Sequence, residues 1–202
     1  MPTRREMMAM GAALASLGPV VGPVEGRAAE LGDDGMHKQP WFTDSFLELG
    51  DDLATAAGQG RHLMILFEQN GCPYCRELHR VNFARAEIVE MIKANFDVIQ
   101  LNMFGSREVL DFDGQALEEK ALAEKWGVNF TPTTLIFHQK NVGAKDRAAA
   151  ETFRLPGYLK PFHYLSSLEY VESGAFEGES FQRYLQGKFE ALRAQGIDPD
   201  VW

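Results

Sequence analysis

Two periodicities of apolar residues along the chain predict a series of strands and helices. Short apolar runs bounded by turn residues predict buried strands at His62–Phe67 and Thr134–His138, because each run is too short for a free-standing helix. Phe96–Met103 is predicted as a third strand and Glu151–Leu155 as an edge strand. Helical spacing predicts helices at Trp41–Ala57, Cys72–Val81, Arg85–Asn95, Gln115–Trp126, Pro161–Ser173 and Ser180–Ala194.

The order of these elements predicts a single α/β domain, a sheet with helices packed against it. The helices between the first two strands favour parallel pairing of those strands, whereas the strand order within the sheet stays open. The first helix is expected to bury Phe42, Phe46, Leu49 and Leu53. A short hairpin or excursion is expected at Glu108–Gly114.

The first 28 residues have the three parts of a bacterial export signal. Paired arginines follow Thr3, a mildly apolar run extends from Ala9 to Val24, and small residues permit cleavage after Ala28. The arginine pair resembles the twin-arginine type, which predicts a periplasmic protein. The alternative is a short amphipathic or disordered tail. Residues 29–40 are then expected to be a flexible lead-in, and residues 41–202 a single domain.

Composition narrows the classes of function. The chain of 202 residues carries a formal net charge of -9, which repels phosphate backbones and argues against nucleic-acid binding. Outside the first thirty residues no apolar run approaches the length of a membrane span, so the mature protein is expected not to cross a membrane. A domain of this size needs no disulfide or metal to hold its core, and its two cysteines therefore suggest chemistry.

Both cysteines lie in Gly71-Cys72-Pro73-Tyr74-Cys75, after a predicted buried strand and at a predicted helix start. Unpaired N–H groups and the positive end of the helix dipole favour the thiolate form of Cys72, and Pro73 suits the first helical turn. Cys75 lies on the same helical face, set deeper, and is the expected resolving thiol. The pair predicts thiol–disulfide exchange, which requires no cofactor.

Two other interpretations of the cysteine pair are less favourable. A purely structural disulfide would close a very small loop and would stabilise the fold little. A closed zinc site needs four ligands, and only His79 lies near the two cysteines in the sequence. No metal is therefore expected.

The succession of strand, CxxC helix, strand, helix, Thr-Pro and strand resembles the thioredoxin superfamily over roughly Leu63 to Leu192. The resemblance implies a three-layer sandwich with a central mixed sheet flanked by helices, here with an extra N-terminal helix. It also implies a cis-proline at Pro132 facing the disulfide, with the backbone of Thr131 positioned to pair with a substrate strand. The alternative is an ordinary trans turn. Pro73 and Tyr74 complete the expected substrate-binding set, with Tyr74 exposed.

More narrowly, the chain is similar to periplasmic thioredoxins of the bacterial sulfur-oxidation (Sox) system, of the SoxW and SoxS type. The similar segments are Phe67–Cys75, Phe130–Thr133, Arg154–Tyr158 and Phe181–Leu185. The similarity implies an enzyme that reduces a disulfide or modified thiol of a periplasmic partner, such as a sulfur-carrier protein, with electrons from a membrane thiol donor. The alternatives are a disulfide-forming or isomerising protein, and a binding module with a stable disulfide.

One position departs from ordinary thioredoxins. Leu66 stands where they carry a buried acid, six residues before the first cysteine. Glu68 is therefore the candidate to take the proton of Cys75, although a solvent-facing glutamate at the strand end is an equally simple interpretation. His79 is expected on the helix surface, with a role in proton transfer as the alternative.

Overall fold

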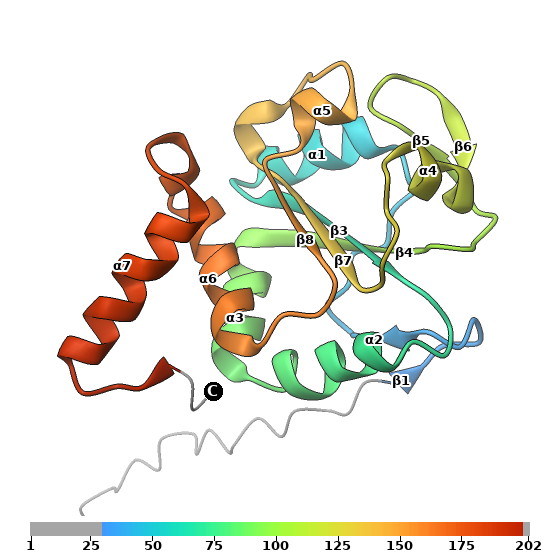
Figure 1. Ribbon diagram of the computed structural model, residues 1–202. Helices are drawn as coiled ribbons and strands as arrows, with labels where there is room; N and C mark the ends of the chain where they lie inside the picture. The colour runs from blue at the N-terminus through green and yellow to red at the C-terminus, as the bar shows by residue number, and fades with distance from the viewer. Residues whose placement is uncertain (1–29, 200–202) are drawn as a thin grey trace, which may run out of the picture.

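A four-stranded mixed sheet forms the middle layer of the computed structural model, which describes residues 30–199 (Figure 1). Its strand order is β4 (Phe96–Asn102), β3 (His62–Glu68), β7 (Thr133–Phe137) and β8 (Phe153–Pro156). β3 pairs in parallel with β4 and antiparallel with β7, and β7 pairs antiparallel with β8. The parallel pairing, the mixed sheet and the edge strand are as predicted. The predicted export signal lies outside the described residues.

The other elements surround this sheet, and their bounds follow in chain order. They are β1 (Glu30–Leu31), β2 (His37–Lys38), α1 (Leu49–Gly58), α2 (Pro73–Glu77), the π-helical turn η1 (Leu78–Asn82), α3 (Ala86–Asn95), β5 (Glu108–Leu110), β6 (Ala116–Glu118), α4 (Glu119–Lys125), the 3-10 turn η2 (Gln139–Asn141), α5 (Arg147–Ala150), α6 (Pro161–Glu172), the 3-10 turn η3 (Ala175–Glu177) and α7 (Phe181–Ala194).

Every residue of β3 is buried, because helices cover both faces of the sheet. Leu63, Ile65 and Phe67 pack in the cluster that contains the apolar residues of α1 and α4. Met64 and Leu66 pack in the opposite cluster, with α3 and α6. Each fully buried aliphatic side chain stabilises the fold by roughly 1.5–3 kcal/mol. The alternation along β3 therefore holds the three layers together.

The predicted N-terminal helix Trp41–Ala57 is wrong in its first half, since α1 begins only at Leu49. Residues before it run along the edge of β4: the Thr43 N–H donates to the Val98 carbonyl at 2.7 Å, and the Val98 N–H donates to Thr43 Oγ1 at 3.1 Å. The unpaired N–H and C=O groups of the edge strand β4 thus form hydrogen bonds with this segment, in place of the hydrogen bonds that a helix would make. Phe46, expected in the core, is 99% exposed.

The expected lead-in contains a small hairpin of β1 and β2, in which Glu30 pairs with Lys38. Met36 of this hairpin is buried. A Cβ added to Gly35, which has a φ of 71°, would lie 2.5 Å from the Asn70 side chain. Only glycine therefore allows the hairpin to approach the loop that follows β3 this closely.

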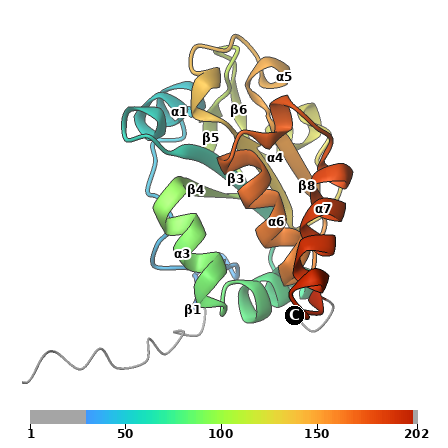
Figure 2. The same ribbon diagram turned by 90° about the vertical axis from the view of Figure 1, so that its left-hand side faces the viewer.

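The predicted hairpin near residue 108 is confirmed as the pair β5 and β6. The strand β6 occupies the first residues of the predicted helix Gln115–Trp126, so α4 begins only at Glu119. The short helix α5 was not predicted. At the carboxyl end, α6 and α7 agree with prediction, and α7 runs along the outside of α6 (Figure 2). Within residues 30–199 no helix is both long and apolar enough to cross a bilayer.

The buried His62 predicts a pH-dependent stability. Burial, and then the charge of His138 stacked 4.3 Å away, lower the pKa of His62 from 6.5 to about 4. As the pH falls from 6.5 toward 4, the unfolded chain takes up a proton that the folded chain does not, so stability falls by up to about 1.4 kcal/mol per pH unit.

We expect His62→Gln, which keeps an acceptor for the Gln139 N–H, to make this slope shallower by about 1 kcal/mol per pH unit. Urea unfolding of both proteins across this pH window measures the slope. Parallel stability curves for the two proteins would contradict the assignment.

Candidate redox site

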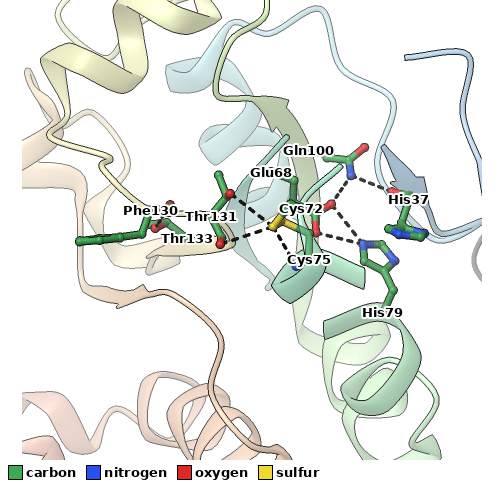
Figure 3. The surroundings of a disulfide bond; sticks show 9 residues. All are labelled: His37, Glu68, Cys72, Cys75, His79, Gln100, Phe130, Thr131 and Thr133. Carbon is green, nitrogen blue, oxygen red and sulfur yellow. Dashed lines mark hydrogen bonds and ion pairs between the residues drawn. A yellow bond between two sulfur atoms is a disulfide. The ribbon is translucent and has the colours of Figure 1, made fainter. Parts of the chain in front are cut away.

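The two cysteines are joined in a disulfide where the loop after β3 enters α2 (Figure 3). Gly71, with a φ of 71°, makes the turn into Cys72, which caps the helix. The Cys75 N–H donates to Cys72 Sγ at 3.0 Å. Cys72 is 7% exposed and Cys75 only 2% exposed. Cys72 is therefore the outer sulfur and Cys75 the inner one, as predicted.

The turn before β7 lies against the outer sulfur. The peptide bond between Thr131 and Pro132 is cis, as the resemblance implies. Cys72 Sγ lies 3.5 Å from the Thr131 carbonyl oxygen and 3.4 Å from Thr131 Oγ1 (Figure 3). The Pro132 carbonyl accepts from the Gly157 N–H at 2.8 Å. These contacts bring Thr131 and Pro132 to the disulfide from a distant part of the sequence.

Exposed aromatic residues flank the cysteines and the cis-proline turn. Tyr74 is 62% exposed, as expected, and stacks on Tyr158 with the ring centroids 6.5 Å apart. Pro73 is also exposed, at the start of α2. Phe130, which precedes the cis peptide, is 65% exposed. The surface around the cysteines and the cis-proline turn thus carries exposed aromatic rings.

Glu68 is buried, so the interpretation of it as a solvent-facing residue is wrong. β3 extends one residue further than predicted, and Glu68 pairs in register with Asn102 of β4. Side chains alternate along a strand, so Glu68 lies on the face of Leu66. That face is covered by η1, α3 and α6. The carboxylate is thereby placed inside the protein, on the side where the CxxC helix packs.

His79 is buried as well, contrary to its expected place on the helix surface. α2 continues into the π-helical turn η1, which turns Leu78, His79 and Asn82 toward the interior. His79 Nε2 lies 3.2 Å and 3.1 Å from the two Glu68 carboxylate oxygens. Each side chain is 1% exposed. A buried carboxylate requires such a partner.

Two further segments contact this pair, and neither was predicted. Gln100 of β4 donates to Glu68 Oε2 and, at 2.8 Å, to the His37 carbonyl. Gln39 Nε2 lies 3.1 Å from His79 Nδ1. Gln100 could have been found from the sequence, because it is a polar residue within an apolar strand. The sequence around Gln39 has no pattern that predicts a buried contact. Burial, with a further contribution from His79, lowers the pKa of His37.

A cleft of about 320 Å³ separates the N-terminal hairpin from the CxxC loop. Its lining includes His37 from the hairpin, Asn70 and Cys72 from the loop, and Arg76 from α2. Cys72 therefore forms part of the wall of this cleft. In the part of the chain that the structure describes, no group of three His, Cys, Asp or Glu residues is arranged to hold a metal ion.

A family model for the thioredoxin-like domain matches residues 49–172. The chain belongs to the thioredoxin-like family. The match begins at α1 and ends with α6, and so includes the CxxC pair and the cis-proline turn.

The chain is also similar to solved structures. A thioredoxin-fold protein from Helicobacter pylori is 23% identical, with a TM-score of 0.50, covering 66% of this chain and 82% of its own. A thioredoxin from Thermus thermophilus is 24% identical, with a TM-score of 0.46 and coverage of 61% and 83%. The oxidised carboxyl-terminal domain of DsbD from Neisseria meningitidis is 15% identical, with a TM-score of 0.44 and coverage of 64% and 97%. No curated protein matches the chain.

In this thioredoxin-like protein the buried acid has moved along β3. Leu66, at the position where ordinary thioredoxins carry an acid, is fully buried in an apolar cluster. Glu68 lies on the same face and nearer the carboxyl end of the strand, where the CxxC loop begins. The structure therefore has a buried carboxylate at a different position on the same face of β3, in contact with His79 of the helix that follows the cysteines.

Replacing Glu68 should slow the release of a bound partner. If Glu68 takes the proton of Cys75, we expect Glu68→Gln to slow resolution of a mixed disulfide by about a hundredfold or more, with little change in the first attack by Cys72. Stopped-flow mixing of the reduced protein with a chromogenic aromatic disulfide resolves the two steps, because each step releases one coloured thiolate.

Glu119→Gln serves as the matched control. Glu119 is also buried, but its carboxylate is bound by Arg107 and by the Asn102 N–H. A resolution rate in Glu68→Gln equal to that of the control would refute the role of Glu68.

Proposed function

We propose that this thioredoxin-like protein is an exported thiol–disulfide oxidoreductase that reduces a disulfide or modified thiol of a periplasmic partner. The observation that carries the proposal is the contact of Cys72 Sγ with Thr131, beside the cis peptide to Pro132. A partner segment that pairs with the Thr131 backbone would place its own sulfur against Cys72.

The exchange proceeds in two steps. In the reduced protein the Cys72 thiolate attacks a partner sulfur, so that a mixed disulfide forms and the other partner sulfur leaves as a thiolate. Cys75 then loses its proton and attacks Cys72 Sγ. The Cys72–Cys75 disulfide forms, the bond to the partner breaks, and two electrons have passed to the partner. A thiol donor at the membrane restores the dithiol.

The sulfur-oxidation resemblance supports a sulfur-carrier protein as the partner. Two of the similar segments, Phe130–Thr133 and Arg154–Tyr158, meet at the disulfide, where the Gly157 N–H donates to the Pro132 carbonyl. Tyr158 stacks on Tyr74 at the same surface. Three of the four segments that carry the resemblance, with Phe67–Cys75 as the third, therefore border the disulfide at the surface that a partner would contact.

The reduction potential of the Cys72–Cys75 pair tests the direction of electron flow. We expect a value of about -250 mV or below, which suits a reductase supplied from the membrane. Equilibration against glutathione or thioredoxin, followed by counting of thiols, measures it. A value near about -120 mV would identify an oxidant and rule out the reduction of a carrier thiol.

A trapping experiment tests the partner and the location together. Cys75→Ser removes the resolving thiol, so the full-length variant in its native host should accumulate as a mixed disulfide in the periplasmic fraction, with its amino terminus following Ala28. Mass spectrometry of the complex released by dithiothreitol identifies the partner. The double variant with Cys72→Ser should trap nothing. A protein found only in the cytoplasm, or equal recovery with both variants, would contradict the proposal.

A further inference from the structure

The polar cluster on the inner side of the disulfide is completed by the N-terminal segment. Glu68, His79 and Gln100 come from the body of the fold, whereas Gln39 and the His37 carbonyl come from the hairpin strand and the residue that follows it. In the view of Figure 3, the disulfide lies between Thr131 on one side and the Glu68–His79 pair on the other. The family match starts at residue 49, so this completing segment lies outside it.

The contact with Gln39 favours the tautomer of His79 that donates a hydrogen bond to Glu68. The amide nitrogen of Gln39 is a donor, so its 3.1 Å contact makes Nδ1 of His79 the acceptor. In the tautomer that accepts this hydrogen bond, the ring carries its proton on Nε2, 3.1 Å from Glu68 Oε2. Glu68 thus receives one N–H from His79 and another from Gln100. The two donors hold the carboxylate in one orientation.

His79 is also tied to the inner cysteine. Cys75 and His79 are four residues apart on the continuous helix of α2 and η1, so they share a helical face one turn apart. Both are buried, and that face packs toward Glu68. The His79 ring therefore links the Glu68 carboxylate to the helix that carries Cys75.

The cluster is fully hydrogen-bonded. Among buried side-chain oxygen and nitrogen atoms of residues 30–199, only Asn82 Oδ1 lacks a partner. The aromatic rings of Phe42 and Phe83 stand edge-on to His79, at 5.9 Å and 5.1 Å, and enclose it. A satisfied, enclosed network of this kind holds its members in a single arrangement.

We propose that Gln39 and His79 are positioning residues for the redox reaction, and that the N-terminal segment is thereby part of the active site. This inference rests on the proposed function. Gln39 keeps His79 in the tautomer that donates to Glu68, and His79 keeps the carboxylate aimed at the Cys75 thiol.

The step that they assist is the resolution of the mixed disulfide. The Cys75 proton passes to the Glu68 carboxylate, and the Cys75 sulfur attacks Cys72 Sγ. The disulfide within the protein forms as the bond to the partner breaks, and the partner leaves as a thiolate. Glu68 later returns its proton to solvent. No further oxidant or reductant is needed.

The test separates the two thiolate-release steps of the reaction with a chromogenic aromatic disulfide. Gln39→Met keeps the length of the side chain but removes its donor, and Gln39→Glu presents only acceptors to Nδ1 at neutral pH. We expect both variants to slow the second, concentration-independent step about tenfold and to leave the first, bimolecular step unchanged. His79→Gln, which keeps an N–H donor, should lose less of the second step than His79→Leu.

Ile92→Ala is the control for a merely structural effect. Ile92 of α3 is fully buried in the same apolar cluster and makes none of these polar contacts, so its truncation should destabilise the fold without slowing the second step. If the second step is no slower in Gln39→Met than in Ile92→Ala, the inference is overturned. If the protein shows no first thiolate release that requires Cys72, the proposed function itself is refuted.

Discussion

A carboxylate buried at the end of the central strand is the constraint on which the site depends. Removing an ionised group from water costs several kcal/mol unless charges or donors compensate, so Glu68 requires partners. It obtains them from η1 and β4, and the hairpin holds those partners in turn. Satisfying one buried group therefore ties four segments of the chain together beside the inner cysteine.

The two sulfurs consequently lie in different environments. Cys72 contacts Thr131 at the cis-proline turn, beside the exposed ring of Phe130, and this is the surface at which we propose that a partner binds. Cys75 faces the interior, where access of water is restricted and proton transfer depends on protein groups. In the function that we propose, recognition of the partner therefore takes place on the outer side and resolution of the mixed disulfide on the inner side.

Errors of the sequence-based prediction have physical causes in long-range contacts. Apolar spacing correctly located α3, α6 and α7, since α3 and α6 bury apolar residues in one cluster and α7 packs the partly buried Phe181 and Tyr184 against it. The same spacing failed at residues 41–48, because Thr43 pairs with the edge of β4 and the Leu47 carbonyl accepts a hydrogen bond from the Leu110 N–H. His79 was misplaced because a π-helical turn changes which residues face inward.

The sequence by itself determined the order of the main strands and helices, the paired cysteines Cys72 and Cys75, and the proline expected to be cis, because these features follow from local periodicity and from short motifs. Only the tertiary structure decided that Glu68 is buried, that His79 is its partner and that Gln39 reaches them. Those contacts join residues that are 11 and 40 positions apart in the chain. No local pattern encodes them, since they arise only when the packed layers exclude water and each buried polar group must find a partner.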